Sequence, residues 1–247
     1  MKNTFKFEFH ILYYIVAFIC MLTGYFKSFI WISLLIIIHE CGHVTGAILC
    51  NWKIEKVVIM PFGGMTILKE NLNKPLYQEW IIVLLGPLYQ MAFYFFLLMF
   101  QKVNIEFRLY HYILLGFNLL PMIPLDGSKM LGLILETFFP YRKAKTIEFY
   151  FSIVFVFLLS GYCLMQRNIL LGIILIFIWI ENLKYWKKIP YYFEKFLLER
   201  YLYEFSFSKC FKIKGLNLTK MKRGYRHLFF QNGRWQTENE ALKNYFL

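Results

Sequence analysis

Long apolar runs separated by short polar segments make up most of the chain, and this pattern predicts helices that cross a membrane. Several runs approach the roughly 20 residues that a helix needs to span a bilayer. The sequence predicts six spans, over residues 10–25, 29–49, 78–100, 109 to a break at 118–127, 149–165 and 169–183. No small-x-small cleavage site follows the first run, so we expect a retained span rather than a signal peptide.

Residues 57–68, between the second and third spans, follow a different pattern. β-Branched residues flank Pro61 and a Gly-Gly pair, which predicts two short strands joined by a turn. One interpretation is an interfacial hairpin with no further role. The other is an edge strand that binds an extended substrate peptide, with Phe62 and Gly63 among its contacts.

The pattern becomes mixed and charged after residue 190. Residues 191–205 predict an amphipathic linker helix, and residues 206–247 predict a small tail with a strand, a turn and a final helix. We therefore expect an all-α polytopic membrane protein. Its six transmembrane helices lie in residues 1–190, with a short interfacial β-hairpin and a small α+β cytoplasmic tail.

Composition supports a membrane protein, since 59% of the 247 residues are hydrophobic and soluble domains are nearer 45–50% apolar. The net charge of +13 is explained by Lys and Arg that flank the spans and face the anionic lipid bilayer. No recognisable nucleic-acid-binding module is present, so we expect no direct nucleic-acid partner. The five cysteines include no C-x-x-C pair, which predicts neither a disulfide framework nor a cysteine zinc site.

The distribution of Lys and Arg also predicts the orientation of the chain. With six spans, one side holds only Lys27, Lys102, Arg108 and Arg167. The other side holds Lys2, Lys6, Lys53, Lys56, Lys69, Lys74, Arg142, Lys143, Lys145, Lys184, Lys187 and Lys188. Because Lys and Arg are enriched in cytoplasmic loops, we expect a multi-pass protein of the cell membrane with both termini in the cytoplasm.

The second span contains the sequence His39-Glu40-Cys41-Gly42-His43. On a helix, positions i and i+4 share a face, so both imidazoles can bind one metal ion. Glu40 lies about 100° further round the helix, where it can hold a metal-bound water. This is the His-Glu-x-x-His pattern of zinc hydrolases. A single histidine in a membrane is more often a packed, hydrogen-bonded residue, but that alternative does not explain this spacing.

The fourth span is broken by Asn118, Pro121, Pro124 and an Asp-Gly pair. Irregular backbone at membrane depth is tolerated only where it is buried in protein or lines a wet cavity. We therefore expect Asn118, Pro121 and Pro124 to contact the backbone of an extended substrate.

Asp126 is the only aspartate in the chain and follows this break. Catalytic zinc usually has three protein ligands and a water, and the predicted topology places Asp126 at the depth of His39 and His43. We expect it to be the third ligand; the alternative is a simple Asp-Gly turn at the end of a span.

Zinc at such a site lowers the pKa of a bound water and polarises a carbonyl, and Glu40 can act as general base and then general acid. The predicted activity is that of a zinc endopeptidase. A non-proteolytic metal carrier or channel is the alternative, but it would need ligands along a path, whereas here the polar groups share one depth. A zincin with a downstream Glu-x-x-x-Asp is excluded, because Met122 stands where the Glu would be.

Together these motifs resemble those of the site-2 proteases, which are intramembrane zinc metalloproteases. The resemblance covers about residues 1–190. It rests on His39-Glu40-x-x-His43, Pro61-Phe62-Gly63-Gly64, Gly86-Pro87 and Asn118-x-x-Pro121-x-x-Pro124-Leu125-Asp126-Gly127. It implies zinc on His39, His43 and Asp126, Glu40 as the base, and cleavage of a membrane-associated protein near the cytosolic face.

Within the family, six spans and a cytoplasmic tail are similar to the branch of stage IV sporulation protein FB. That branch releases a sigma factor from its membrane-bound pro-form and carries a C-terminal CBS domain. The tail from Met221 to Leu247 resembles one CBS motif but is shorter, half of a nucleotide-binding pair. The resemblance therefore implies a pro-sigma factor as substrate and sporulation as the setting. It leaves membrane-protein inhibitors or regulators and a homo-oligomer open.

Overall fold

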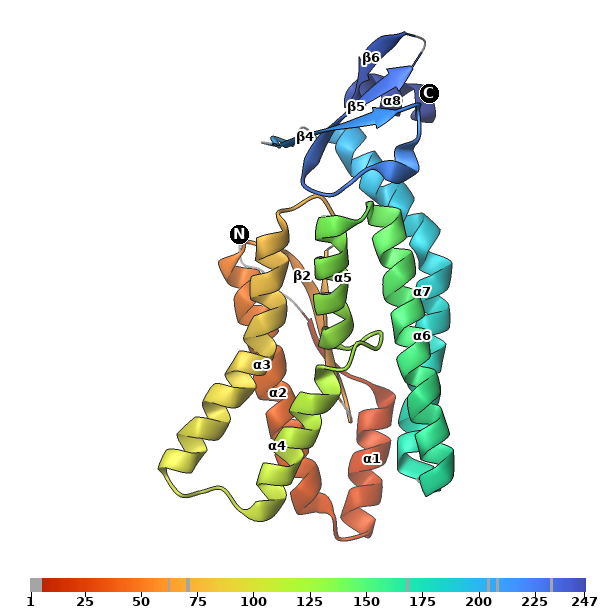
Figure 1. The fold of residues 1–247 in the computed structure, drawn as a ribbon. Coiled ribbons are helices and arrows are strands. Elements are labelled where there is room, and N and C mark those ends of the chain that lie inside the picture. Colours follow the sequence, from red (N-terminus) through yellow and green to blue (C-terminus); the bar gives the residue numbers. More distant parts are fainter. Residues whose placement is uncertain are drawn as a thin grey trace. The chain divides into compact units, whose positions relative to one another are not determined.

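The computed structural model describes residues 6–61, 63–69, 72–167, 169–203, 205–207, 209–231 and 233–247. Over these residues the chain is mostly helical, with two small sheets (Figure 1). It divides into two compact units, Met1–Glu70 with Tyr77–Leu120, and Asn71–Leu76 with Pro121–Leu247. Among the described residues, three helices are long and apolar enough to cross a membrane: Phe26–Leu49, Leu76–Met99 and Tyr141–Gln166.

The first unit contains a three-stranded sheet and four helices. Its elements are β1 (Lys6–Phe9), α1 (Ile11–Leu22), α2 (Phe26–Leu49), β2 (Ile54–Met60), β3 (Gly63–Leu68), α3 (Leu76–Met99) and α4 (Ile105–Asn118). The predicted hairpin is present as β2 and β3, which pair antiparallel with Val57 opposite Thr66.

The sequence analysis did not predict β1, which lies parallel to β2. Its four residues are too few to show a period, and only the distant partner strand makes them extended. The predicted hairpin is therefore a three-stranded sheet in the order β1-β2-β3. With a second sheet in the tail, the all-α class is too narrow, and a mostly helical membrane protein with two small sheets is the correct description.

The second unit consists of three helices followed by the tail. Its elements are α5 (Asp126–Phe138), α6 (Tyr141–Gln166), α7 (Ile169–Leu202), β4 (Lys209–Lys214), a 3-10 turn η1 (Leu218–Lys220), β5 (Tyr225–Gln231), β6 (Arg234–Thr237) and α8 (Glu238–Phe246). Residues 191–202 are helical as expected. They continue α7 rather than forming a separate linker helix, because Pro190 removes only one backbone donor from the helix.

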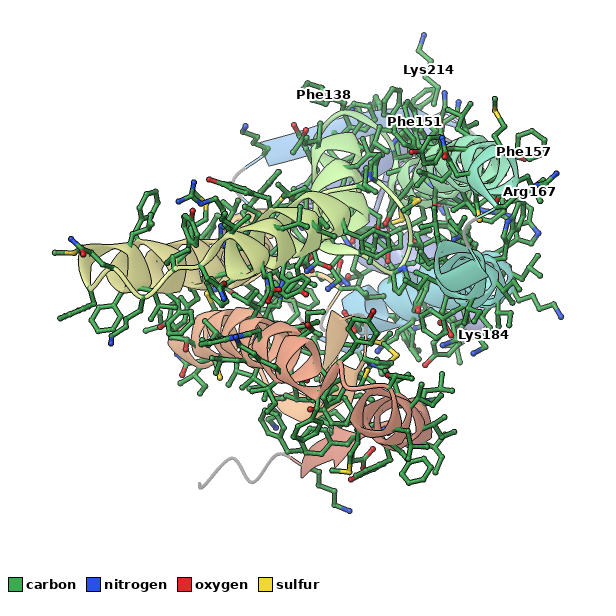
Figure 2. All side chains as sticks on the ribbon, turned by 90° about the horizontal axis from the view of Figure 1, so that it is seen from below. Phe138, Phe151, Phe157, Arg167, Lys184 and Lys214 are labelled. Carbon is green, nitrogen blue, oxygen red and sulfur yellow. The ribbon has the colours of Figure 1, made fainter. Side chains whose placement is uncertain are left out.

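The outer face of α6 is strongly apolar. Its residues Phe151 and Phe157, labelled in Figure 2, are 48% and 70% exposed. Contiguous apolar surface of this kind is rare on soluble monomers, and it suits contact with lipid. The length and surface of α6 are therefore those of a membrane span.

Buried charges hold the tail to the helices of its own unit. Arg223, in the tail, donates from Nη1 to Oε2 of Glu136 at 3.0 Å, near the end of α5. Lys145 of α6 binds the other oxygen of Glu136 at 2.8 Å. Arg200, near the end of α7, donates to Glu238 at the start of α8 at 2.9 Å. Removing one partner of such a pair would leave a buried charge without compensation.

Candidate metal centre

His39 and His43 lie one turn apart on α2 and are almost fully buried. Their Nε2 atoms are 3.1 Å apart. Two nitrogens bound to one tetrahedral zinc at about 2.05 Å would be separated by about 3.3 Å. The predicted i, i+4 geometry is therefore present within the first unit.

The other ring nitrogen of each histidine faces an acceptor. Nδ1 of His43 lies 2.8 Å from the carbonyl oxygen of Ile82, and Nδ1 of His39 lies 3.1 Å from Oε1 of Gln90. Oxygens of these types can only accept, so each Nδ1 carries the proton and each Nε2 presents a lone pair. Two lone pairs at this separation repel each other unless a cation lies between them, and neutral imidazole nitrogens are preferred ligands of zinc.

Small residues allow α3 to approach this site closely. A Cβ atom on Gly86 would overlap the ring of His43, and one on Gly42 would overlap the backbone of Leu85. Pro87 follows Gly86 inside α3 and removes a helical hydrogen bond. The Gly86-Pro87 pair therefore gives His43 its space beside the α3 backbone.

The Glu40 carboxylate lies against β3. Thr66 Oγ1 donates to Glu40 Oε2 at 2.6 Å, and Gly64 lies so close that a Cβ there would overlap the carboxylate. Because Oε2 accepts the hydrogen bond from Thr66, the lone pairs of the other carboxylate oxygen, Oε1, are the ones that can take up a proton. The predicted general base is thus buried, oriented and next to the first histidine in sequence.

The broken segment after α4 is fixed by two polar side chains of the second unit. Ser152 of α6 accepts from the backbone N–H of Ile123 at 2.8 Å. Asn182 of α7 donates to the carbonyl of Ile123 at 3.1 Å and accepts from Ser152 at 2.6 Å. The irregular backbone is thereby satisfied inside protein, as membrane depth requires.

The predicted substrate-contacting residues are distributed around these elements. Asn118 ends α4 and is buried, while Pro121 and Pro124 lie in the broken segment. Gly63 is the first residue of β3. Phe62 lies outside the described residues.

Asp126 is the first residue of α5 and is buried. Its Oδ1 lies 2.9 Å from Nζ of Lys129, one turn further along the helix. Its carboxylate is therefore compensated by charge within the second unit. Chemically it is an oxygen donor suited to zinc.

Four residues with a role in the site were missed by the sequence analysis: Gln90, Thr66, Ser152 and Asn182. Gln90, Ser152 and Asn182 each have an apolar helix around them, where a polar side chain is costly. A single polar residue inside an apolar helix therefore indicates that the residue has a polar partner, but it does not identify that partner.

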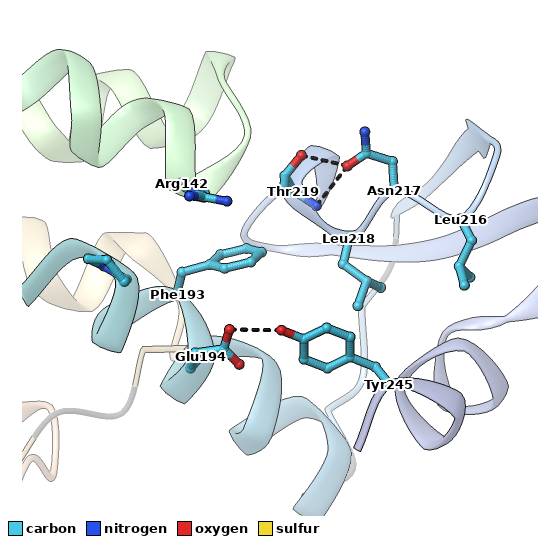
Figure 3. A pocket seen from close by; sticks show the side chains of 9 residues that line it. Arg142, Phe193, Glu194, Leu216, Asn217, Leu218, Thr219 and Tyr245 are labelled. Carbon is cyan, nitrogen blue, oxygen red and sulfur yellow. Dashed lines mark hydrogen bonds between the residues drawn. The ribbon is translucent and has the colours of Figure 1, made fainter. Parts of the chain in front are cut away.

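A separate hollow of about 300 Å³ lies in the second unit and is lined partly by the tail (Figure 3). Its polar side chains bind one another: Tyr245 donates to Glu194 at 2.8 Å, and Thr219 donates to Asn217. The Arg142 guanidinium lies over the ring of Phe193. These groups have partners already, so the hollow adds nothing to the chemistry of the metal centre.

Comparison with known proteins matches these features. The model of peptidase family M50 matches residues 27–111, which include nearly all of α2, the hairpin and α3. The chain is 31% identical over 205 residues to stage IV sporulation protein FB of Bacillus subtilis, covering 79% of this chain and 71% of that protein. It is also 31% identical over 163 residues to a zinc metalloprotease of Methanocaldococcus jannaschii, covering 61% of this chain and 47% of that protein.

A solved structure agrees on the fold. The site-2 protease from Methanocaldococcus jannaschii superposes with a TM-score of 0.60 at 24% identity, covering 72% of this chain and 89% of that one. The apolar helices, the paired imidazoles and the similarity to the sporulation protein lead to one conclusion. The chain belongs to peptidase family M50, the site-2 proteases, and is a membrane-embedded zinc metalloprotease.

Proposed function

We propose that this protein hydrolyses a peptide bond of a membrane-associated protein, with zinc held by His39, His43 and Asp126 and with Glu40 as the base. The observation that carries the proposal is that the Nε2 atoms of His39 and His43 lie 3.1 Å apart. The buried carboxylate of Glu40 directly follows His39 in sequence. Two imidazole nitrogens and one carboxylate oxygen, all buried, make a donor set that suits catalytic zinc.

Zinc, when bound there, supplies a polarised carbonyl and an acidified water. Glu40 takes the proton of the attacking water and then delivers it to the leaving amide nitrogen. Thr66 holds Oε2 of Glu40 throughout, so the second oxygen is the one that moves the proton. The imidazoles keep their Nδ1 protons on Ile82 and Gln90, and neither competes as a base.

The substrate must be extended at the cleaved bond, because a helix shields its own peptide groups. In the described part of the first sheet, β3 pairs on one side only, with β2. We propose that an unwound substrate segment lies along the other edge of β3, starting at Gly63. Asn118, Pro121 and Pro124 then contact its backbone from the broken segment.

The proposed orientation in the membrane rests on the distribution of Lys and Arg, and the proposed substrate rests on similarity to a relative. With six spans, the excess of Lys and Arg around one set of loops supports both termini in the cytoplasm, and hence cleavage near the cytosolic face. The similarity to a protein named for sporulation supports a membrane-tethered pro-sigma factor as substrate.

The test is Glu40→Gln, compared with Glu55→Gln, which makes the same change on an exposed residue of β2. Both proteins are placed in inverted membrane vesicles with a tagged pro-sigma factor, and fragments and bound zinc are measured. We expect Glu40→Gln to bind zinc but to lose cleavage by at least about 10³-fold, while Glu55→Gln releases a soluble fragment on the cytoplasmic side. Cleavage retained by Glu40→Gln would refute the role of Glu40, and a fragment on the other side would refute the orientation.

A further inference from the structure

A chain of polar contacts runs from His39 through α3 to α4, all within the first unit. Gln90 Oε1 lies 3.1 Å from His39 Nδ1. On the far side, Gln90 Nε2 lies 3.1 Å from the backbone oxygen of His111 and 3.4 Å from its Nδ1. The ring of Tyr94 stacks on His111 at 4.1 Å between centroids. Gln90 is fully buried, and His39, His111 and Tyr94 are each at most 5% exposed.

The partners of Gln90 fix which way its amide points. The backbone oxygen of His111 can only accept a hydrogen bond, so the amide nitrogen must face it. The reverse orientation would place two oxygens 3.1 Å apart. The amide oxygen must therefore face His39, and this requires the proton of His39 to be on Nδ1.

We infer that Gln90 is a positioning residue for zinc. It holds His39 in the tautomer and ring orientation that direct the Nε2 lone pair towards His43, and His111 in turn holds Gln90. The inference deepens the proposed function, since it rests on zinc ligation by His39. Partners of this kind, on the second nitrogen of a zinc-bound histidine, typically change metal affinity by 10- to 100-fold.

A purely structural role would be a simpler explanation, because a buried amide must be hydrogen-bonded somewhere. Joining α3 to α4 needs only the donation from Gln90 to His111. That role gives no reason for the amide oxygen to lie against a histidine of the His-Glu-x-x-His motif. The two explanations make different predictions for substitutions that keep one half of the amide.

The first test compares Gln90→Leu with Gln78→Leu in the full-length protein in detergent, with zinc affinity measured by chelator competition. Gln78 lies on the same helix and accepts a hydrogen bond from Trp52 Nε1 at 2.9 Å, away from the histidines. We expect Gln90→Leu to lower zinc affinity about 10- to 100-fold and Gln78→Leu to leave it unchanged. Unchanged affinity in Gln90→Leu would overturn the inference. Gln90→Met replaces the leucine variant if that protein does not fold.

The second test is Gln90→Glu, which keeps an acceptor for His39 and, with its carboxyl group ionised, cannot donate to the backbone of His111. If Gln90 positions His39, zinc affinity stays within about threefold of wild type or rises, because a carboxylate is also a good partner for a zinc-bound histidine. If Gln90 only joins the helices, Gln90→Glu weakens zinc binding as much as Gln90→Leu does, and the inference fails. His39→Ala must lose zinc in the same assay; if it does not, the proposed ligation itself is wrong.

Discussion

A backbone carbonyl binds His43 on one side. On the other side lies a glycine, which has no side chain to displace the ring. The carbonyl oxygen of Ile82 accepts a hydrogen bond from Nδ1 of His43 at 2.8 Å, and Gly86 leaves room for the His43 ring. The two constraints come from one turn of α3, so the ring has little freedom to rotate. Single residues of α3 therefore set the geometry of the site as strongly as the histidines themselves.

This predicts that Gly86→Ala disturbs zinc binding without touching a ligand. The added methyl group would displace the His43 ring, and overpacking of this kind costs about 1–3 kcal/mol. We expect zinc affinity to fall at least about tenfold, as it does when a histidine is badly oriented. Gly116→Ala on α4 is the matched control, because nothing lies within 4 Å of a Cβ there. Equal zinc affinities in the two variants, measured by chelator competition, would contradict the account of His43.

At the scale of single residues, the sequence predicted those site residues that lie close together along the chain. His39, Glu40 and His43 were predicted because their geometry depends only on a helix of one turn. Gln90 and Thr66 were not, because their partners are 51 and 26 residues away in sequence. A polar residue inside an apolar span signals that a partner exists, but only the fold identifies it.

Among the elements, the start of α8 is fixed by buried ionisable groups of the tail. His227 on β5 binds Glu238 at 3.0 Å and accepts from the backbone N–H of Lys222 at 2.9 Å. Burial lowers the pKa of His227, against a smaller opposing effect of Glu238. Burial alone would raise the pKa of Glu238, but hydrogen bonds from His227 and the charge of Arg200 outweigh it and lower the pKa.

The lowered pKa values of His227 and Glu238 both predict that the folded tail becomes less stable in acid. Between the lowered pKa of His227 and its ordinary value of about 6.5, the unfolded tail binds more protons than the folded tail, so stability falls as the pH falls. The contribution of Glu238 is present above its ordinary pKa and is lost as the pH falls through its lowered pKa. We expect the hydrogen-exchange protection factors of β5 and α8, which are corrected for the intrinsic pH dependence of exchange, to fall progressively below pH about 6.5. His227→Gln should remove the upper part of this dependence; the same pH profile in both proteins would contradict it.

The elements themselves were predicted where their pattern was regular and long. α2, α3 and the β2–β3 hairpin lie within a few residues of their predicted bounds. α5 was missed because its mixed sequence lies between two spans and resembles a loop. A break at Pro190, before a separate linker helix over residues 191–205, was wrongly expected. The helix α7 continues through Pro190 to Leu202, because a helix can tolerate an internal proline.

At the scale of the whole molecule, the proposed zinc ligands come from both compact units. His39 and His43 belong to the first, and Asp126 belongs to the second. The sequence analysis placed all three residues in one membrane domain of residues 1–190, with Asp126 after the broken span. It could not show how Ser152 and Asn182 hold the intervening backbone, since those contacts join segments 29 and 59 residues apart.

The most direct measurement is zinc stoichiometry and affinity in Asp126→Ala, His39→Ala and Glu181→Ala. Glu181 is the matched control, because it is a carboxylate of the second unit that pairs with a lysine three residues later, as Asp126 does. We expect one zinc per chain in wild type and Glu181→Ala, with at least about 100-fold weaker binding in His39→Ala and Asp126→Ala. Wild-type zinc affinity in Asp126→Ala would contradict this expectation and place the third ligand elsewhere.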